Sequence, residues 1–375
     1  MKICFTSASF DAAYGGPALS VSHLAAAVAE TGADAAIWAP DGSAVTSEVV
    51  PSHGKITRLD GSFQDALLRF GRPDLVHDSG VWLPHNHKIA AYCDRENLCR
   101  IVSPRGMLEP WAMQYKRLKK QIAWRLYQKR DLETAAALHA TSDAEAAQFG
   151  ALGLSAPVHR APNGTDIPDE AALEAARVQR GPRSPRTALF LSRVHPKKGL
   201  SLLVKAWSDC RGNGMLDGWR LIIAGPVELD HDQEIQALVD KAGLSADIHL
   251  VGAQYGDAKT ALLVNADLFI LPTHSENFGI AVAEALAHGC PVITTTAAPW
   301  QALETERAGW WVDPEWKAIA QALADACVLD DRNRREMGAR GRVLVAKNYG
   351  WPGIGRQMVD TYQSVLETWQ RQAAA

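Results

Sequence analysis

Short apolar runs alternate with longer stretches of helical character along most of the chain. In the first half, the apolar run "KICFTSA" is followed by an alanine-rich helical stretch over 17–32 and then by the apolar run "ADAAIWAP". Runs of this length between helical stretches are typical of strands. The predicted strands cover 2–8, 33–40, 74–80, 99–106, 137–142, 186–194, 219–226, 247–253, 266–273 and 290–295. Because strands that alternate with helices pair in parallel, the pattern predicts an α/β protein with doubly wound parallel sheets.

Two domains are expected, because 375 residues are too many for one compact core. The segment 168–187 is polar, contains three prolines and separates the two sets of predicted strands. We therefore predict a first domain over 1–167, a linker over 168–186 and a second domain over 187–349. The chain is helical again after Pro352, and we expect the helix over 350–375 to pack back on the first domain.

Composition narrows the class of protein. Hydrophobic residues make up 47% and charged residues 22% of the chain, and the net charge is −3, which fits a globular protein without a strong overall field. The six cysteines are scattered without a CxxC pair, which argues against a structural zinc site and for a reducing compartment. The N-terminal run is too short for a signal peptide, and no stretch approaches the roughly 20 apolar residues of a membrane span. The sequence thus predicts a cytoplasmic protein.

Glycines and cations that follow predicted strands are candidates for binding an anion. Gly15 and Gly16 lie between the first strand and the first helix, where backbone N–H groups are free to bind phosphate. The alternative is an ordinary turn with Pro17 at the first helical position. Arg193 stands at the end of the predicted strand over 186–194, and Lys198 follows it before a helix, so the two cations suit a diphosphate. The alternative there is a solvated basic loop.

Two glutamates stand eight positions apart in "THSENFGIAVAEALAHGCPVI". They could be an acid/base pair, a metal site, a clamp on a ribose or two unrelated surface charges. Gly279 permits a close backbone approach just before a predicted helix, and Glu284 lies about one turn, or ~6 Å, into that helix. A phosphate at the helix N-terminus would leave Glu284 beside a ribose and Glu276 on the opposite side of the phosphates. Glu284 stands in an apolar run, where a charge needs a partner, and no further Asp or His cluster favours a metal.

Taken together, these motifs resemble those of the retaining GT-B glycosyltransferases of the GT4 family. The resemblance covers nearly the whole chain and is strongest over 186–305. It is carried by the two glutamates in "SENFGIAVAE", by "SRVHPKKG", by "APNGTDI" and by the glycine pair after the first strand. It implies two Rossmann-like domains facing a cleft, with an N-terminal acceptor-binding domain and a C-terminal domain that binds a nucleotide-sugar donor.

The same resemblance implies a function and a set of site residues. A hexose would move from a UDP- or GDP-sugar to a saccharide acceptor with retention, and neither a metal nor another cofactor would be needed. Glu276, Arg193 and Lys198 would be the catalytic group, with Glu276 on the donor sugar and the two cations on the diphosphate. Glu284 would bind the ribose. The donor-binding residues implied are Gly16, Arg193, Lys198, Glu276, Asn277, Phe278, Gly279, Ile280 and Glu284. Backbone groups around 250–255 would meet the base, and Trp300 is either a pocket residue or a core residue.

One position departs from the family pattern. Many relatives have a histidine after the strand that here reads "RIVSPRGML", where this chain has Arg105 and Gly106. An arginine cannot serve as a base at neutral pH, but it can bind a phosphate or a sugar hydroxyl. His77 is another histidine near a strand end, and it either lines the cleft or is structural. The candidates for the acceptor side and the cleft are Gly15, His77, Arg105 and Gly106.

The segment 105–130 is strongly basic, with eight Lys or Arg residues and one Glu. Aromatic and apolar residues recur within it at helical spacing, which is typical of a helix at a membrane surface. The membrane-surface candidates are Lys116, Arg117, Lys119, Lys120 and Trp124. The alternative is an apolar stripe packed on the first domain beneath solvated cations. No nucleic-acid motif accompanies the charge.

The basic segment favours a lipid-linked saccharide acceptor, in assembly of an exopolysaccharide, capsule or lipopolysaccharide, and a peripheral position at the inner face of the cell membrane. A soluble acceptor, a nucleotide-sugar 2-epimerase of the same fold and a non-catalytic nucleotide-sugar sensor remain alternatives.

Overall fold

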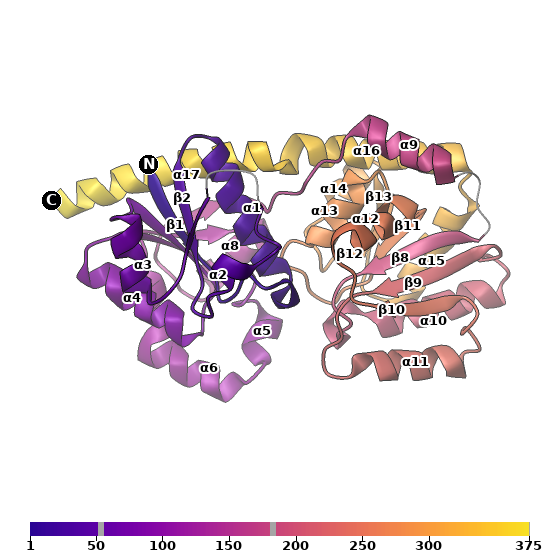
Figure 1. The fold of residues 1–375 in the computed structure, drawn as a ribbon. Coiled ribbons are helices and arrows are strands. Elements are labelled where there is room, and N and C mark those ends of the chain that lie inside the picture. Colours follow the sequence, from indigo (N-terminus) through magenta and orange to yellow (C-terminus); the bar gives the residue numbers. More distant parts are fainter. Residues whose placement is uncertain (52–55, 181–184, 375) are drawn as a thin grey trace. The chain divides into compact units, whose positions relative to one another are not determined.

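A computed structural model describes residues 1–51, 56–180 and 185–374 of the chain. It divides into two compact units (Figure 1), one formed by Met1–Gly164 with Trp351–Ala375 and the other by Thr165–Gly350. Each unit holds one parallel sheet with helices around it. The predicted α/β class with two doubly wound parallel-sheet domains is confirmed.

The first unit contains a seven-stranded sheet in the order β3-β2-β1-β4-β5-β6-β7, and every pair of neighbours is parallel. Its strands are β1 (Lys2–Thr6), β2 (Asp34–Trp38), β3 (Ile56–Leu59), β4 (Leu75–Ser79), β5 (Cys99–Ser103), β6 (Ala137–Ala140) and β7 (Val158–Arg160). Its α-helices are α1 (Gly16–Glu30), α2 (Ser43–Thr46), α3 (Phe63–Phe70), α4 (Pro84–Arg95), α5 (Pro110–Gln114), α6 (Arg117–Ala123), α7 (Lys129–Glu133), α8 (Asp143–Ala151) and α17 (Trp351–Ala374). A 3-10 turn, η1 (Ala12–Tyr14), precedes α1, and a π-helix, η2 (Trp124–Gln128), follows α6.

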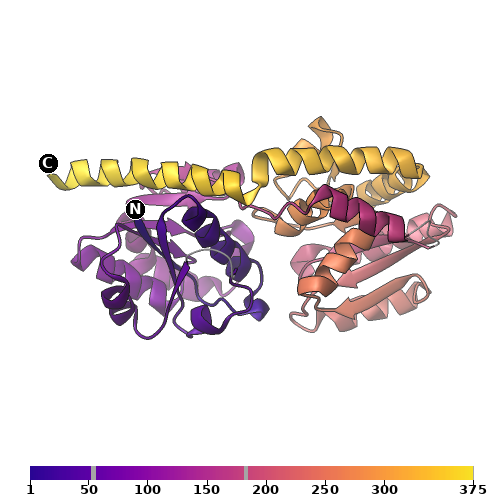
Figure 2. The same ribbon diagram turned by 45° about the horizontal axis from the view of Figure 1, so that its top comes forward.

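Alternate residues of the central strands enter different apolar clusters. Ile3 and Phe5 of β1 pack with residues of α1 and α17, whereas Cys4 packs with residues of α3 and α4. This alternation is expected of a strand that is buried on both faces. Helix α17, the yellow helix that reaches the C-terminus in Figure 2, approaches α1 so closely that a Cβ at Gly355 would meet the Ala27 carbonyl group. Tyr362 of α17 is fully buried.

The second unit contains a six-stranded parallel sheet in the order β10-β9-β8-β11-β12-β13. Its strands are β8 (Arg186–Leu191), β9 (Trp219–Ala224), β10 (Ile248–Gly252), β11 (Leu268–Leu271), β12 (Val292–Thr295) and β13 (Gly309–Val312). Its α-helices are α9 (Glu170–Arg180), α10 (Leu200–Gly212), α11 (His231–Lys241), α12 (Gly256–Asn265), α13 (Ile280–Ala287), α14 (Ala302–Thr305), α15 (Trp316–Val328) and α16 (Asp331–Tyr349). A 3-10 turn, η3 (Pro196–Lys198), precedes α10.

The structure differs from the sequence prediction in two places. Three strands were not predicted, namely β3, β7 and β13, which are short strands at the edges of the sheets and only partly buried. The predicted linker over 168–186 contains helix α9, which belongs to the second unit, while residues 181–184 of that segment lie outside the described residues. Helix α9 has Glu, Gln and Arg residues among its alanines, and among the side chains of α9 that the structure describes Leu173 is the buried one, so its composition resembles that of a linker.

Candidate functional site

The loop after β11 presents Glu276 and then starts helix α13. Gly279 is the N-cap of this helix and has a φ of 83°, in the left-handed region that favours glycine. A Cβ at Gly279 would lie 3.1 Å from Trp300 Nε1 and 3.2 Å from Glu276 Cγ. The indole of Trp300, which is 1% exposed, donates a hydrogen bond of 2.5 Å to the Phe278 carbonyl. Trp300 is therefore a core residue that holds the loop in place, and Asn277 and Ile280 flank the buried Phe278–Gly279 step.

Glu276 forms a buried ion pair with Lys198. The two side chains are 16% and 7% exposed, and the Lys198 ammonium donates a hydrogen bond to Glu276 Oε2. Burial opposes the ionisation of Glu276, but the Lys198 charge and hydrogen bond outweigh it, so the pKa of Glu276 is lower than usual. Glu276 is accordingly a carboxylate at neutral pH.

Lys198 reaches Glu276 because the loops after β8 and β11 are joined by hydrogen bonds. His195 caps the 3-10 turn η3 by accepting from the Lys197 N–H at 3.0 Å. The Lys197 carbonyl in turn accepts from the His274 N–H at 2.8 Å. Gly199, with a φ of 70°, packs against the Pro272 carbonyl, where a Cβ would collide. The two loops thus form one rigid edge of the second unit.

Glu284 has a cation of its own. Its Oε1 lies 2.5 Å from the ammonium of Lys259 on α12, and the two side chains are 16% and 25% exposed. Sequence reasoning missed Lys259, although it follows the 250–255 segment that was expected to meet the base. Glu276 and Glu284 are therefore each paired with a different lysine. Among the described residues, no group of three or more His, Cys, Asp or Glu side chains could hold a metal ion.

Arg193, which is predicted to meet a diphosphate together with Lys198, forms an ion pair with Glu228 in this structure, and its contact with a diphosphate stays a prediction. Its guanidinium is half exposed and donates to both carboxylate oxygens of Glu228, at 2.8 and 3.0 Å. Glu228 follows β9 and was not predicted. Arg193 nevertheless remains close enough to Glu276 to favour its ionised form. In this structure it forms an exposed ion pair beside the buried one.

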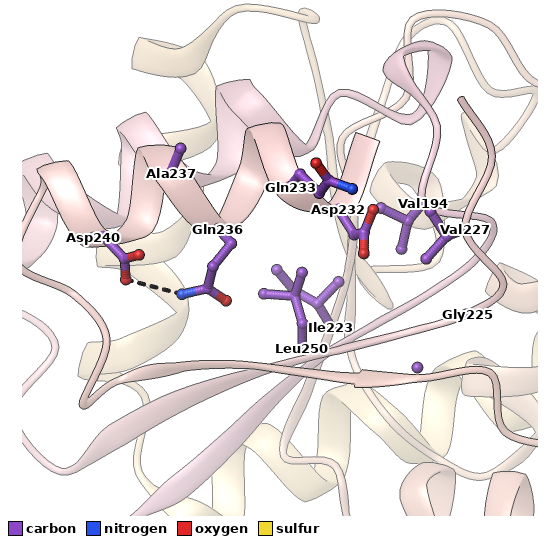
Figure 3. Close-up of a pocket in the computed structure, with 11 residues that line it drawn as sticks. Val194, Ile223, Gly225, Val227, Asp232, Gln233, Gln236, Ala237, Asp240 and Leu250 are labelled. Atoms are coloured by element: carbon purple, nitrogen blue, oxygen red, sulfur yellow. Dashed lines mark hydrogen bonds between the residues drawn. The ribbon is translucent and has the colours of Figure 1, made fainter. Parts of the chain in front are cut away.

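A cavity of about 510 Å³ opens beside Val194, between the ends of β8, β9 and β10 and helix α11 (Figure 3). Val194, Ile223 and Leu250 form its apolar part. Helix α11 adds polar side chains, among which Gln236 donates to Asp240 at 2.9 Å. Cavities of this size and mixed lining are typical of small-molecule sites. Leu250 and Gly252 belong to the segment that the sequence predicts to meet a base.

The candidates in the first unit have mixed outcomes. Gly15 has a φ of 82° and caps α1, whose first residue is the exposed Gly16, so the predicted turn and helix start are in place. Their contact with a ligand stays a prediction. His77 does not line any open surface, because it is fully buried, 2.6 Å from the Tyr362 hydroxyl. It lies two residues before the end of β4 and faces α17, and burial holds its pKa well below the usual range.

Arg105 also points into the first unit. It has a φ of 55°, and its Nη1 donates to Asn163 Oδ1 at 2.6 Å and to Ser20 Oγ at 3.3 Å. Its Nε and Nη2 are buried without a hydrogen-bond partner among the described residues, and burial lowers its pKa to about 10. The neighbouring Gly106 N–H donates to Glu145 at 2.6 Å. A substrate contact of Arg105 or Gly106 stays a prediction.

The membrane-surface candidates divide into two groups. Lys116, Arg117 and Lys119 are exposed. Lys120 and Trp124 turn inward instead: the Lys120 ammonium lies over the Trp82 ring and donates to the Ala112 carbonyl at 2.6 Å, and Trp124 packs 6.1 Å from Trp82. Within the described residues, no helix has both the length and the apolar character to cross a bilayer.

Comparisons with known proteins agree with this architecture. The family model described as "Glycosyl transferases group 1" matches residues 174–343, and the one described as "Glycosyl transferase 4-like domain" matches residues 15–164. HepE from Anabaena, solved in complex with UDP and glucose, has the same fold with a TM-score of 0.73 at 19% identity, over 97% of this chain and 100% of that one.

Two curated relatives share part of their length with this chain. "Putative colanic acid biosynthesis glycosyltransferase WcaL" of Salmonella typhimurium is 26% identical over 50% of this chain and 48% of its own. "Phosphatidyl-myo-inositol mannosyltransferase" of Mycobacterium tuberculosis is 30% identical over 58% and 56%. The chain therefore spans about half the length of the curated relatives it matches. Since the two family models together cover most of the chain, and the fold is that of GT-B enzymes, the chain belongs to the GT4-type GT-B glycosyltransferases.

Proposed function

We propose that this protein is a retaining glycosyltransferase that moves a hexose from a UDP- or GDP-sugar to a lipid-linked saccharide acceptor. One observation carries the proposal: two partly buried carboxylates, Glu276 before the start of α13 and Glu284 within it, are each paired with a lysine of their own. A helix N-terminus and a lysine suit a diphosphate. Two such carboxylates suit the hydroxyl groups of a sugar and of a ribose, because ionised carboxylates only accept hydrogen bonds.

In the proposed complex the donor diphosphate meets the N–H groups at the start of α13, beside Lys198. Glu276 accepts hydrogen bonds from the donor sugar, and Glu284 accepts them from the ribose, with Lys259 holding the ribose-binding carboxylate in place. The cavity of about 510 Å³ at the ends of β8 to β10 is the proposed place of the base. Arg193 exchanges Glu228 for a phosphate oxygen, a small movement for a half-exposed ion pair.

The proposed chemistry is electrostatic. The bond between the sugar C1 and the phosphate oxygen breaks, and its electrons go to the leaving nucleoside diphosphate. The acceptor hydroxyl oxygen bonds to C1 from the same face, and its proton passes to a phosphate oxygen. Fixed cations and helix N–H groups stabilise the charge that grows on the diphosphate, and such preorganised groups lower a barrier effectively. We propose no metal for this step, because Lys198 and Arg193 supply the positive charge.

The comparisons support the choice of substrates. HepE was solved with UDP and glucose, which supports a nucleotide-sugar donor. One relative is named for the biosynthesis of colanic acid and another for transfer to a phosphatidyl-inositol. We therefore propose an acceptor of the glycolipid or polysaccharide class, as in assembly of an exopolysaccharide, capsule or lipopolysaccharide.

A thermal-shift panel of UDP-, GDP-, ADP- and dTDP-sugars tests the donor site. A donor at 100 times its dissociation constant should stabilise the protein by about 2.7 kcal/mol. Glu284→Gln should remove most of that shift, whereas Glu306→Gln, at an exposed position of the same unit, should keep it. The donor site would be wrong if no nucleotide sugar shifted the midpoint or if Glu284→Gln left the shift intact. Consumption of the donor in the absence of any acceptor, with a new epimeric sugar nucleotide formed, would identify an epimerase instead.

A further inference from the structure

The cavity beside helix α11 has an apolar wall and a polar wall (Figure 3). The apolar wall consists of side chains from β9 and β10 and from the loops after β8 and β9, namely Val194, Ile223, Val227 and Leu250. The Val194 N–H donates to the Pro226 carbonyl at 2.8 Å, and the Val194 carbonyl accepts from the Glu228 N–H at 3.1 Å. These two hydrogen bonds fix Val227 beside Val194, and Val227 is 44% exposed although it is apolar. An apolar side chain held at the mouth of a cavity suits a ligand with a flat apolar face.

The polar wall offers mainly hydrogen-bond acceptors. It consists of four side chains of α11, namely Asp232, Gln233, Gln236 and Asp240. The Gln236 amide nitrogen donates to Asp240 Oδ1 at 2.9 Å, so the carbonyl oxygen of Gln236 remains as an acceptor. Gln233 contributes an amide that can donate as well as accept. We call these four side chains the α11 wall.

Asp232 is the carboxylate of the α11 wall that lacks a partner. It is partly buried, and within residues 1–51, 56–180 and 185–374 its side chain takes part in neither an ion pair nor a hydrogen bond. A carboxylate that is partly withdrawn from water is stabilised by accepting N–H groups. In Figure 3, Asp232 and Gln233 lie at the same end of the cavity as Val194 and Val227. A flat ring against the two valines would therefore present its edge to Asp232 and Gln233.

The bases of nucleotides differ in the edge that they would present there. Guanine carries two neighbouring donors, N1–H and N2–H₂, next to the acceptor O6. Uracil carries one N–H between two carbonyl oxygens, and adenine carries one amino group next to a nitrogen acceptor. A carboxylate has two oxygens that can accept two parallel N–H bonds, and it repels a carbonyl oxygen. An unpaired carboxylate beside an amide donor thus matches guanine better than uracil or adenine.

We propose that the α11 wall selects guanine, so that the sugar donor is a GDP-sugar. Asp232 accepts from guanine N1–H and N2–H₂, Gln233 donates to O6, and Val194 and Val227 contact the face of the ring. The inference rests on the proposed donor site and adds to it the identity of the base. Asp232 determines specificity and takes no part in the transfer of the sugar.

The test is titration calorimetry of the full chain at pH 7.5 with GDP, IDP, UDP and ADP. GDP should bind about tenfold more tightly than UDP or ADP, because a bidentate contact to a base discriminates by about this factor or more. IDP differs from GDP only in lacking the N2 amino group, and it should bind about tenfold more weakly than GDP. Asp232→Asn replaces one acceptor by a donor, so it should reduce the affinity for GDP to about that for IDP and leave the affinity for UDP unchanged. The ratio of the two affinities is read within one variant, so a partly unfolded variant still gives a valid result.

The matched control is Glu234→Gln, at a side chain of α11 that is 64% exposed and does not line the cavity. It should keep all four affinities. Equal binding of GDP and UDP, equal binding of GDP and IDP, or a preference for ADP would overturn the selection of guanine. An unchanged ratio of GDP to UDP affinity in Asp232→Asn would overturn the assignment to the α11 wall. If none of the four nucleotides bound, the donor site of the proposed function would itself be wrong, and the inference would fall with it.

Discussion

The buried ion pair between Lys198 and Glu276 provides the sharpest test of the site. We consider Lys198→Met, Glu276→Gln and the double variant in the ligand-free protein. Both side chains are mostly removed from solvent, at 7% and 16% exposure. Each single substitution therefore leaves a buried charge without its partner, whereas the double variant leaves no charge at all.

The expected magnitudes follow from this burial. Removing one member of a buried pair costs about 3 kcal/mol of unfolding free energy, at the lower end of the usual range because neither group is fully enclosed. Because the double variant leaves no unpaired charge, it should cost only about 1 kcal/mol, where independent effects would cost about 6. The pKa of Glu276 is lowered in the folded state. The contribution of ionised Glu276 to the free energy of unfolding is thus present above the ordinary carboxyl pKa, and it is lost as the pH falls through the pKa of the folded state.

Urea unfolding at pH 7.5, followed by tryptophan fluorescence, measures this cycle. The matched control is the exposed pair Arg332–Glu336, whose atoms are 3.9 Å apart and whose side chains are 77% and 55% exposed. Its coupling should stay at or below about 0.5 kcal/mol. The reasoning about the buried pair would be refuted if the losses of unfolding free energy at Lys198 and Glu276 were additive. It would also be refuted if each single variant lost less than about 1 kcal/mol. The gap between wild type and Glu276→Gln should also narrow as the pH is lowered, since both then carry a neutral side chain.

Three further changes test separate parts of the structure. Lys259→Gln should weaken binding of the nucleoside diphosphate about tenfold, or about 1.4 kcal/mol, because Glu284 loses the cation that holds it. Titration calorimetry measures this affinity, and an unchanged affinity would contradict the role of Lys259. Gly279→Ala should lower stability by about 1–2 kcal/mol, since a φ of 83° strains an L-residue, and an unchanged thermal midpoint would contradict the loop geometry. Asp78→Asn should stabilise the protein at pH 8 by up to about 3 kcal/mol, because burial raises the pKa of Asp78 from 3.8 to about 6 and ionisation above that pH costs stability. This gain should fall below about 1 kcal/mol at pH 4, so an equal effect at both pH values would argue against ionisation as its cause.

Much of the fold could be predicted because central parallel strands have a strong local pattern. Strands such as β1 and β11 are buried on both faces, so they read as continuous apolar runs bounded by helical stretches. The missed strands lack long apolar runs, because β3 (ITRL) and β7 (VHR) contain polar residues and β13 (GWWV) is only four residues long. Helix α9 was also missed, because a helix that buries little apolar surface has the composition of a linker.

The site residues show which features of the site could be predicted from the sequence and which could not. The start of α13 at Ile280, after Gly279, was predicted because a glycine followed by an apolar helical run is a local pattern. The partners Lys259 and Glu228 were missed, because ion pairs between segments 25 and 35 residues apart depend on the tertiary fold. Burial of His77 was also undetermined, since in a strand covered on both faces either orientation leads into a core.

The pairing of each carboxylate with a lysine bears on what the carboxylates can do under the proposed function. A general acid must carry a proton at neutral pH, and the lowered pKa of Glu276 removes that proton. Lys198 keeps Glu276 ionised before any ligand arrives, so its oxygens can only accept hydrogen bonds. When a diphosphate takes a share of the lysine's hydrogen bonds, the carboxylate and the phosphate are joined through one cation. The pair then fixes the distance between the sugar hydroxyls and the leaving group, and this is a positioning role that neither residue could fill alone.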